Sequence, residues 1–245
     1  MEHADFVTHF RTQVDALHAA AAAAGPDAPV PTCPGWTVKD LVDHVGRVHS
    51  WVLNALDTPP DDATPRPDER PGAWEDLLPW WLTRARELAD ALAGTTSNTP
   101  AWTFSPTERT YGFWARRQAH ETAIHRLDAE HALHGDEVPS LLFDTDLAAD
   151  GVDEFLTLML PRQLSRRPVA REGRLVFHAA DAGRAWELRL TPGQPAGVGP
   201  IQDAATDADA TVAGTADALY RAVWARPSGA ITSGDRSLLD GLPRP

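Results

Sequence analysis

The apolar residues of this chain change their spacing near residue 165, and this change limits what the chain can fold into. Before that point they recur every three to four residues, as in an amphipathic helix, and directly after it two runs alternate with polar residues, as in strands. The basic, proline-containing segment 165–173 separates the two patterns. The sequence therefore predicts a helical domain over residues 1–165 and a small α+β domain over residues 166–245.

Long helical segments make up the first part of the chain. Thr37 has the position of an N-cap residue, and Asp40 follows it at the third position of a capping box. Four long helices and one further helix predict a four-helix bundle with an additional helix after it. The expected helices are 4–24, 37–56, 73–93, 111–134 and 146–163.

The second part predicts strands and two shorter helices. Two alternating runs, 174–181 and 185–191, are separated by a short turn that contains a glycine, which is typical of a β-hairpin. A further strand is expected within 208–215. A helix is expected to begin after Thr215, and a last short helix lies within 233–242.

Charge and composition exclude several classes of protein. The 35 acidic residues exceed the 22 basic ones and give a net charge of −13, which argues against a nucleic-acid-binding face. No apolar run is long enough for a membrane span, and the N-terminus lacks the basic and apolar regions of a signal peptide. Cys33 is the only cysteine, so no internal disulfide can form. We therefore expect a cytoplasmic protein that acts on small molecules.

The helix at 111–134 carries a polar stripe where a core-facing stripe is expected. Glu121, His125 and Asp128 fall on one narrow face, and the spacing of Glu121 and His125 lets the two side chains hold one metal ion. His120 and Glu121 begin like the metalloprotease pattern H-E-x-x-H, but that pattern fails because Ile124 stands at its second histidine. A Glu–His pair at this spacing is also common as an ordinary ion pair, so spacing alone leaves both interpretations open.

The helix at 37–56 offers a third ligand. His44 lies beside its apolar stripe and can point into a bundle interior, whereas His49 on the other edge is the weaker candidate. Two histidines and one glutamate leave a coordination position open, which is typical of catalytic zinc. The alternative for His44 is a half-buried, hydrogen-bonded histidine without a metal.

Several segments resemble the mycothiol-dependent maleylpyruvate isomerase family. The stretch 30–46 resembles its N-terminal signature, 117–130 its second signature and 149–156 a third. The segments 207–215 and 233–235 are similar to its C-terminal domain.

This resemblance implies a DinB-like four-helix bundle followed by a sterol-carrier-protein-like α+β domain. It implies a divalent metal, generally zinc, held by His44, Glu121 and His125. It implies mycothiol, the small thiol of actinobacteria, as co-substrate, and an arginine near the end of the C-terminal helix, for which Arg226 is the catalytic candidate.

The expected function is that of a zinc-dependent, mycothiol-using S-transferase or cis–trans isomerase, in which a metal-bound thiolate attacks a small electrophile. The alternatives are a metal-dependent hydrolase and a non-catalytic metal- and ligand-binding protein. Cys33 is interpreted as a buried packing group, since the reactive sulfur would come from the co-substrate. Arg116, Arg117 and Arg126 are expected to project away from the ligand face, so maleylpyruvate itself is not predicted as the substrate. The substrate and the oligomeric state stay open.

Overall fold

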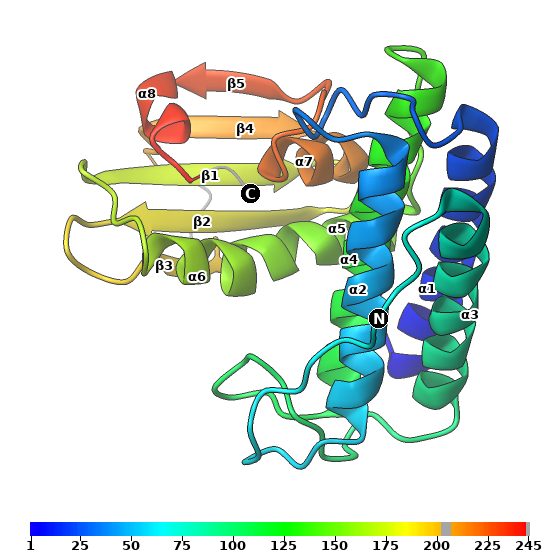
Figure 1. Cartoon of the computed structure of the whole chain (residues 1–245). Helices are drawn as coiled ribbons and strands as arrows, with labels where there is room; N and C mark the ends of the chain where they lie inside the picture. The colour runs from blue at the N-terminus through cyan, green and yellow to red at the C-terminus, as the bar shows by residue number, and fades with distance from the viewer. Residues whose placement is uncertain (202–206, 244–245) are drawn as a thin grey trace. The chain divides into compact units, whose positions relative to one another are not determined.

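The structure, a computed structural model, describes residues 1–201 and 207–243 (Figure 1). The chain divides into two compact units, Met1–Val138 and Pro139–Pro245, and each is described by itself. None of the helices among the described residues has the length and apolar character to cross a membrane.

Four long helices build the first unit, as the hydrophobic spacing predicts. They are α1 (His3–Ala24), α2 (Val38–Leu56), α3 (Trp74–Ala93) and α4 (Tyr111–His134). Helix α1 packs mainly against α4 and α2 mainly against α3, while α1–α3 and α2–α4 contacts close the bundle. The fully buried side chains of Phe10, Leu41, Trp81 and Trp114 come one from each helix and form part of its core.

The N-terminus of α2 is held by the expected capping box. The Thr37 hydroxyl accepts a hydrogen bond from Asp40 N, and the Asp40 carboxylate accepts one from Thr37 N at 2.8 Å. These bonds lower the pKa of Asp40 below its ordinary value, the backbone hydrogen bond of Thr37 contributing most. The cap sets where α2 begins, and therefore where His44 lies along the helix.

A long interrupted helix opens the second unit. Helix α5 (Thr145–Glu154) continues through a π-helical turn, η1 (Phe155–Met159), into α6 (Leu160–Leu164). The helix expected at 146–163 is therefore present, but its π-helical turn has no signal in the hydrophobic spacing. Helix α5 packs against α7 (Ala216–Val223), which in turn contacts the sheet.

A five-stranded mixed sheet forms the rest of the second unit. Its order is β3-β2-β1-β4-β5, with β1 and β4 parallel and the other neighbours antiparallel. The strands are β1 (Gly173–Ala179), β2 (Arg184–Leu190), β3 (Gly197–Pro200), β4 (Ala210–Gly214) and β5 (Ile231–Gly234), and the short helix α8 (Arg236–Asp240) follows them.

The sheet confirms the predicted hairpin and adds two strands. Strands β1 and β2 pair from Gly173 with Leu190 to Ala179 with Arg184, and Gly183 takes a left-handed φ of 59° in the turn between them. The edge strands β3 and β5 were not predicted, because each has only four residues and no clear alternation of apolar and polar side chains. The fold class is confirmed: a helical bundle followed by a small α+β domain.

The two units meet at residues 138 and 139, whereas the sequence places its boundary near residue 165. Helices α5 and α6 belong to the same unit as the sheet, and α5 packs against α7 within that unit. An amphipathic helix shows in its sequence that one face is buried, but not which partner buries it.

Candidate metal centre

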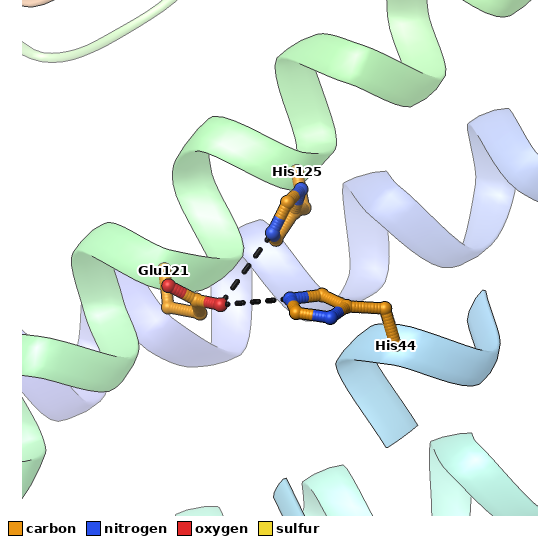
Figure 2. A group of neighbouring side chains, drawn as sticks. All are labelled: His44, Glu121 and His125. Carbon is orange, nitrogen blue, oxygen red and sulfur yellow. Dashed lines mark hydrogen bonds and ion pairs between the residues drawn. The ribbon is translucent and has the colours of Figure 1, made fainter. Parts of the chain in front are cut away.

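Three side chains from α2 and α4 converge on one point. Glu121 Oε1 lies 3.2 Å from His44 Nε2 and 3.4 Å from His125 Nε2 (Figure 2). One ligand atom from each residue lies within 4.8 Å of the other two, so the group could hold a metal ion. The structure thus brings together the three residues that the sequence singles out.

The electrostatics of the group favour a charged carboxylate. Burial raises the pKa of Glu121, but hydrogen bonds from His125 and His44 and the charge of Arg117 outweigh it and hold that pKa well below its ordinary value. Burial likewise lowers the pKa of His125, yet hydrogen bonds with Asp128 and Glu121 raise it to about 9 overall. Without a metal, a proton on His125 therefore balances the negative charge of Glu121.

Arg117 corrects the expectation that the arginines of α4 project away from the ligand face. Its Nη2 lies 2.7 Å from Glu121 Oε2, and only 4% of its side chain is exposed. The guanidinium therefore binds one carboxylate oxygen, while the other faces the two histidines. The signal that could have found Arg117 is its spacing: it lies one helical turn before Glu121, as His125 lies one turn after.

Asp128 contacts the remaining nitrogen of His125. Its Oδ2 lies 2.9 Å from His125 Nδ1, and its Oδ1 accepts a hydrogen bond of 2.6 Å from Thr32 Oγ1. Cys33 Sγ donates to Oδ2 at 3.4 Å. Cys33 was expected to be a buried packing group, but its side chain is half-buried and donates a hydrogen bond to a carboxylate that contacts His125.

An aromatic side chain lies against both histidines. The ring centroid of Trp36 is 5.1 Å from that of His44 and 6.4 Å from that of His125, and it stacks on the latter with an interplanar angle of 22°. Trp36 thus adds an apolar wall next to the converging ligand atoms. Trp36 lies in the loop before α2, and nothing in the helical spacing of the sequence indicates that it contacts the ligands.

The two other histidines considered for the site lie in the core of the bundle. His49 is fully buried, with Nε2 3.1 Å from Thr122 Oγ1 and Nδ1 accepting a hydrogen bond of 3.2 Å from Trp81 Nε1. His120 is fully buried too and makes an edge contact with Phe6. Neither belongs to the converging group, in line with the preference for His44 and with the rejection of the H-E-x-x-H pattern.

Arg226 lies in the second unit, just after α7. Its Nη1 donates a hydrogen bond of 2.8 Å to Trp224 O. Together with Phe177 and Val212 it lines a cavity of about 330 Å³. The preceding residue, Ala225, has a φ of 56°, a left-handed conformation that is uncommon outside glycine.

The donor set of the triad fits a divalent transition metal. Imidazole nitrogens and a carboxylate oxygen are ligands that zinc accepts, and three protein ligands leave a fourth position for another molecule. The outer partners fit as well, because a ligating histidine commonly donates its second N–H to a carboxylate, as His125 can do toward Asp128.

Two family models match the sequence, and solved structures of one enzyme have a similar fold. The family model of the mycothiol maleylpyruvate isomerase N-terminal domain matches residues 7–130, and that of the MDMPI C-terminal domain matches residues 146–241. Crystal structures of mycothiol-dependent maleylpyruvate isomerase are similar to this chain, a histidine-to-alanine variant with a TM-score of 0.62 and a second structure with 0.55, both at 16% identity.

Each of these structural alignments covers 100% of this chain and 96% of the other. No curated protein sequence matches the chain at a significant level. The two family models together span most of the sequence, one on each unit of the fold. The chain therefore belongs to the mycothiol maleylpyruvate isomerase family of enzymes.

Proposed function

We propose that this protein is a zinc-dependent, mycothiol-using isomerase that converts a cis double bond, conjugated to a carbonyl group, into the trans form. The observation that carries the proposal is the convergence of His44, Glu121 and His125, with their ligand atoms within 4.8 Å, in a chain of this family.

His44, Glu121 and His125 would hold the metal, and the open position would take the thiol. A bound zinc ion supplies a Lewis acid that lowers the pKa of a coordinated thiol, so that the thiolate is present at neutral pH. Arg117 keeps Glu121 charged and directs its second oxygen toward the histidines. Trp36 excludes water from one side of the ligand atoms.

The isomerisation needs no oxidant or reductant. The thiolate sulfur forms a bond to the β-carbon of the conjugated system, and the electron pair of the double bond moves onto the carbonyl oxygen. Rotation about the resulting single bond is then possible. When the electron pair returns, the carbon–sulfur bond breaks, the double bond re-forms as trans, and the thiol is recovered.

Arg226 remains part of the proposal as a group that binds a carboxylate. A guanidinium binds carboxylates in a bidentate geometry, which lysine cannot reproduce. Arg226→Lys and Arg226→Ala are therefore expected to raise the KM for an anionic substrate, and an unchanged KM in both would remove Arg226 from the proposal.

A metal- and thiol-dependence assay tests the function. The protein is loaded with zinc and supplied with mycothiol and maleylpyruvate as the probe, and the cis and trans forms are followed by absorbance and NMR. We expect turnover only with both zinc and mycothiol present, and with the free thiol concentration constant.

Each alternative has its own result in this assay. Stoichiometric consumption of the thiol with an S-conjugated product would indicate a transferase, and product formation without thiol would indicate a hydrolase. Zinc binding with no turnover of the probe, or of other cis-configured conjugated acids, would favour a non-catalytic binding protein. His44→Ala is the matched loss-of-site variant and should abolish turnover.

A further inference from the structure

The carboxylate of Asp128 contacts His125 on the ring nitrogen that faces away from Glu121. Asp128 has an exposed fraction of 0%, and its Oδ2 lies 2.9 Å from His125 Nδ1. The other ring nitrogen of His125, Nε2, faces Glu121 (Figure 2). An ionised carboxylate accepts hydrogen bonds and cannot donate them. This contact therefore places a ring proton on Nδ1 and directs the lone pair of neutral His125 at Nε2 toward the ligand group.

Two further donors reach the same carboxylate from the loop before α2. Thr32 Oγ1 donates to Oδ1 at 2.6 Å and Cys33 Sγ donates to Oδ2 at 3.4 Å. The loop bends back on itself, with Trp36 N donating to Cys33 O at 3.0 Å, and then runs directly into the cap of α2. Asp128 thus connects a ligand on α4 with the segment that precedes the helix carrying His44.

We propose that Asp128 is a positioning residue of the metal site and that Thr32 and Cys33 hold its carboxylate in place. Asp128 acts through His125: it keeps the ring in the tautomer and orientation in which Nε2 can bind a metal. This inference rests on the metal site proposed above and adds the loop of residues 30–36 to it. We call this arrangement the Asp128 latch.

Linkage makes the latch observable without any enzymatic assay. If a closed latch favours the metal-binding orientation of His125, then a bound metal must favour the closed latch by the same factor. Cys33 is the only cysteine and is half-buried, so the rate at which iodoacetamide alkylates it reports how often the loop releases Asp128. Zinc should therefore slow the alkylation of Cys33.

The first test measures zinc affinity by competition with a chromogenic chelator. Asp128→Asn should weaken zinc binding about 10- to 100-fold, the usual cost of removing such a partner. The physical reason is that an amide NH₂ can donate to Nδ1, which moves the ring proton to Nε2 and blocks the ligand atom.

Thr122→Val is the matched control for the loss of a buried polar group on α4. Thr122 is fully buried and lies 3.1 Å from His49, which is outside the ligand group. We expect Thr122→Val to lower the stability of the bundle while zinc affinity stays within about twofold of the original. A loss of affinity equal to that of Asp128→Asn would show a general effect of destabilisation and overturn the proposal.

The second test uses the loop, where a substitution does not disturb the core. Thr32→Val removes the hydroxyl that reaches Asp128, and Thr32→Ser keeps it. We expect Thr32→Val to weaken zinc binding about 3- to 10-fold and to speed the alkylation of Cys33, because a hydrogen bond to a charged group is lost. Thr32→Ser should behave like the original protein in both measurements.

The outcomes separate this inference from the proposed function. If the original protein binds no zinc, the metal site itself fails. If it binds zinc, and Asp128→Asn and Thr32→Val bind it equally well while zinc leaves the alkylation of Cys33 unchanged, the Asp128 latch fails and the metal site stands.

Discussion

Two pairs of charged side chains, each four residues apart on one helix, have different surroundings in this molecule. On α4, Glu121 and His125 form an i, i+4 pair, and on α7, Asp217 and Arg221 form another. Both pairs are largely buried. In the first, two histidine nitrogens converge on a single carboxylate oxygen (Figure 2). In the second, one carboxylate oxygen of Asp217 forms an ion pair with Arg221, and the other oxygen accepts hydrogen bonds from two backbone N–H groups.

Backbone groups of the second unit form hydrogen bonds with both members of the pair on α7. Asp217 Oδ1 lies 2.5 Å from Arg221 Nε, and Asp217 Oδ2 accepts hydrogen bonds of 2.9 Å from Leu142 N and Phe143 N. Arg221 Nη2 donates to Pro139 O at 2.6 Å. These bonds tie the start of the second unit to α7, so the pair is structural.

The difference shows what marks a site among buried charges. A cluster whose members satisfy one another is structural, and removing one member destabilises the fold because the other charge is left buried without a partner. A cluster in which several lone pairs point at one another needs protons or a cation between them. Spacing along a helix cannot distinguish the two cases, because the distinction depends on what the neighbouring elements bring.

The largest effect is expected from breaking the structural pair. Asp217→Ala should lower the free energy of unfolding by about 3–5 kcal/mol, because Arg221 is left buried without its carboxylate. Urea denaturation followed by circular dichroism measures this loss. Zinc affinity should stay unchanged, and a parallel loss of zinc binding would contradict the assignment of this pair to structure alone.

The next effect concerns the converging group. His44→Ala removes one of three ligands, about a third of a zinc-binding free energy of roughly 12 kcal/mol, so the affinity should fall about 1000-fold. Isothermal titration with zinc gives the value. His49→Gln is the matched control from the same helix and should retain zinc. If both variants bind zinc equally well, His44 is not a metal ligand.

A smaller, pH-dependent effect is expected from His49 in the first unit. Both of its ring nitrogens already have hydrogen-bond partners, so it resembles the structural pair on α7 and not the converging group. Burial lowers the pKa of His49 from 6.5 to about 3, and Trp81 Nε1–H already occupies Nδ1. As the pH falls below about 6.5, the unfolded chain takes up a proton that the native ring refuses. The stabilising contribution is therefore full above pH 6.5 and is lost toward pH 3, by about 1.4 kcal/mol per pH unit.

Unfolding free energies of the metal-free protein at pH 7.5 and pH 5 test this prediction. The original protein should lose more stability over this interval than His49→Gln, which has no imidazole to protonate. Equal losses in the two proteins would mean that His49 is not held neutral by its surroundings.

The smallest effect is expected at the exposed end of a charged cluster in the sheet. Glu187 pairs with Arg174 and Arg189, and 68% of the Arg189 side chain is exposed. Arg189→Ala should change the free energy of unfolding by less than about 1 kcal/mol, since solvent screens the pair and Arg174 remains. Thermal denaturation should show a shift near the limit of detection, and a large shift would place this cluster with the buried pair on α7.

Much of the fold and part of the site follow from the sequence. The four long helices, the cap at Thr37 and the β1–β2 hairpin were predicted because their signals are local: hydrophobic spacing, a capping residue and a turn. The β3 and β5 strands and the π-helical turn were not predicted, because their residues carry no local pattern. The two strands form by pairing with β2 and β4, and the π-helical turn lies within a continuous helix.

The sequence by itself determined the candidates His44, Glu121 and His125, since helical spacing and residue chemistry are written in the chain. Only the tertiary structure decided that Arg117 forms an ion pair with Glu121, and that Asp128 accepts hydrogen bonds from Thr32 and Cys33. The ion pair between Arg221 and Asp217 was likewise decided by the tertiary structure. The reason is physical: ligand chemistry belongs to single residues, but whether a buried charge is satisfied depends on the groups that packing places within hydrogen-bonding distance.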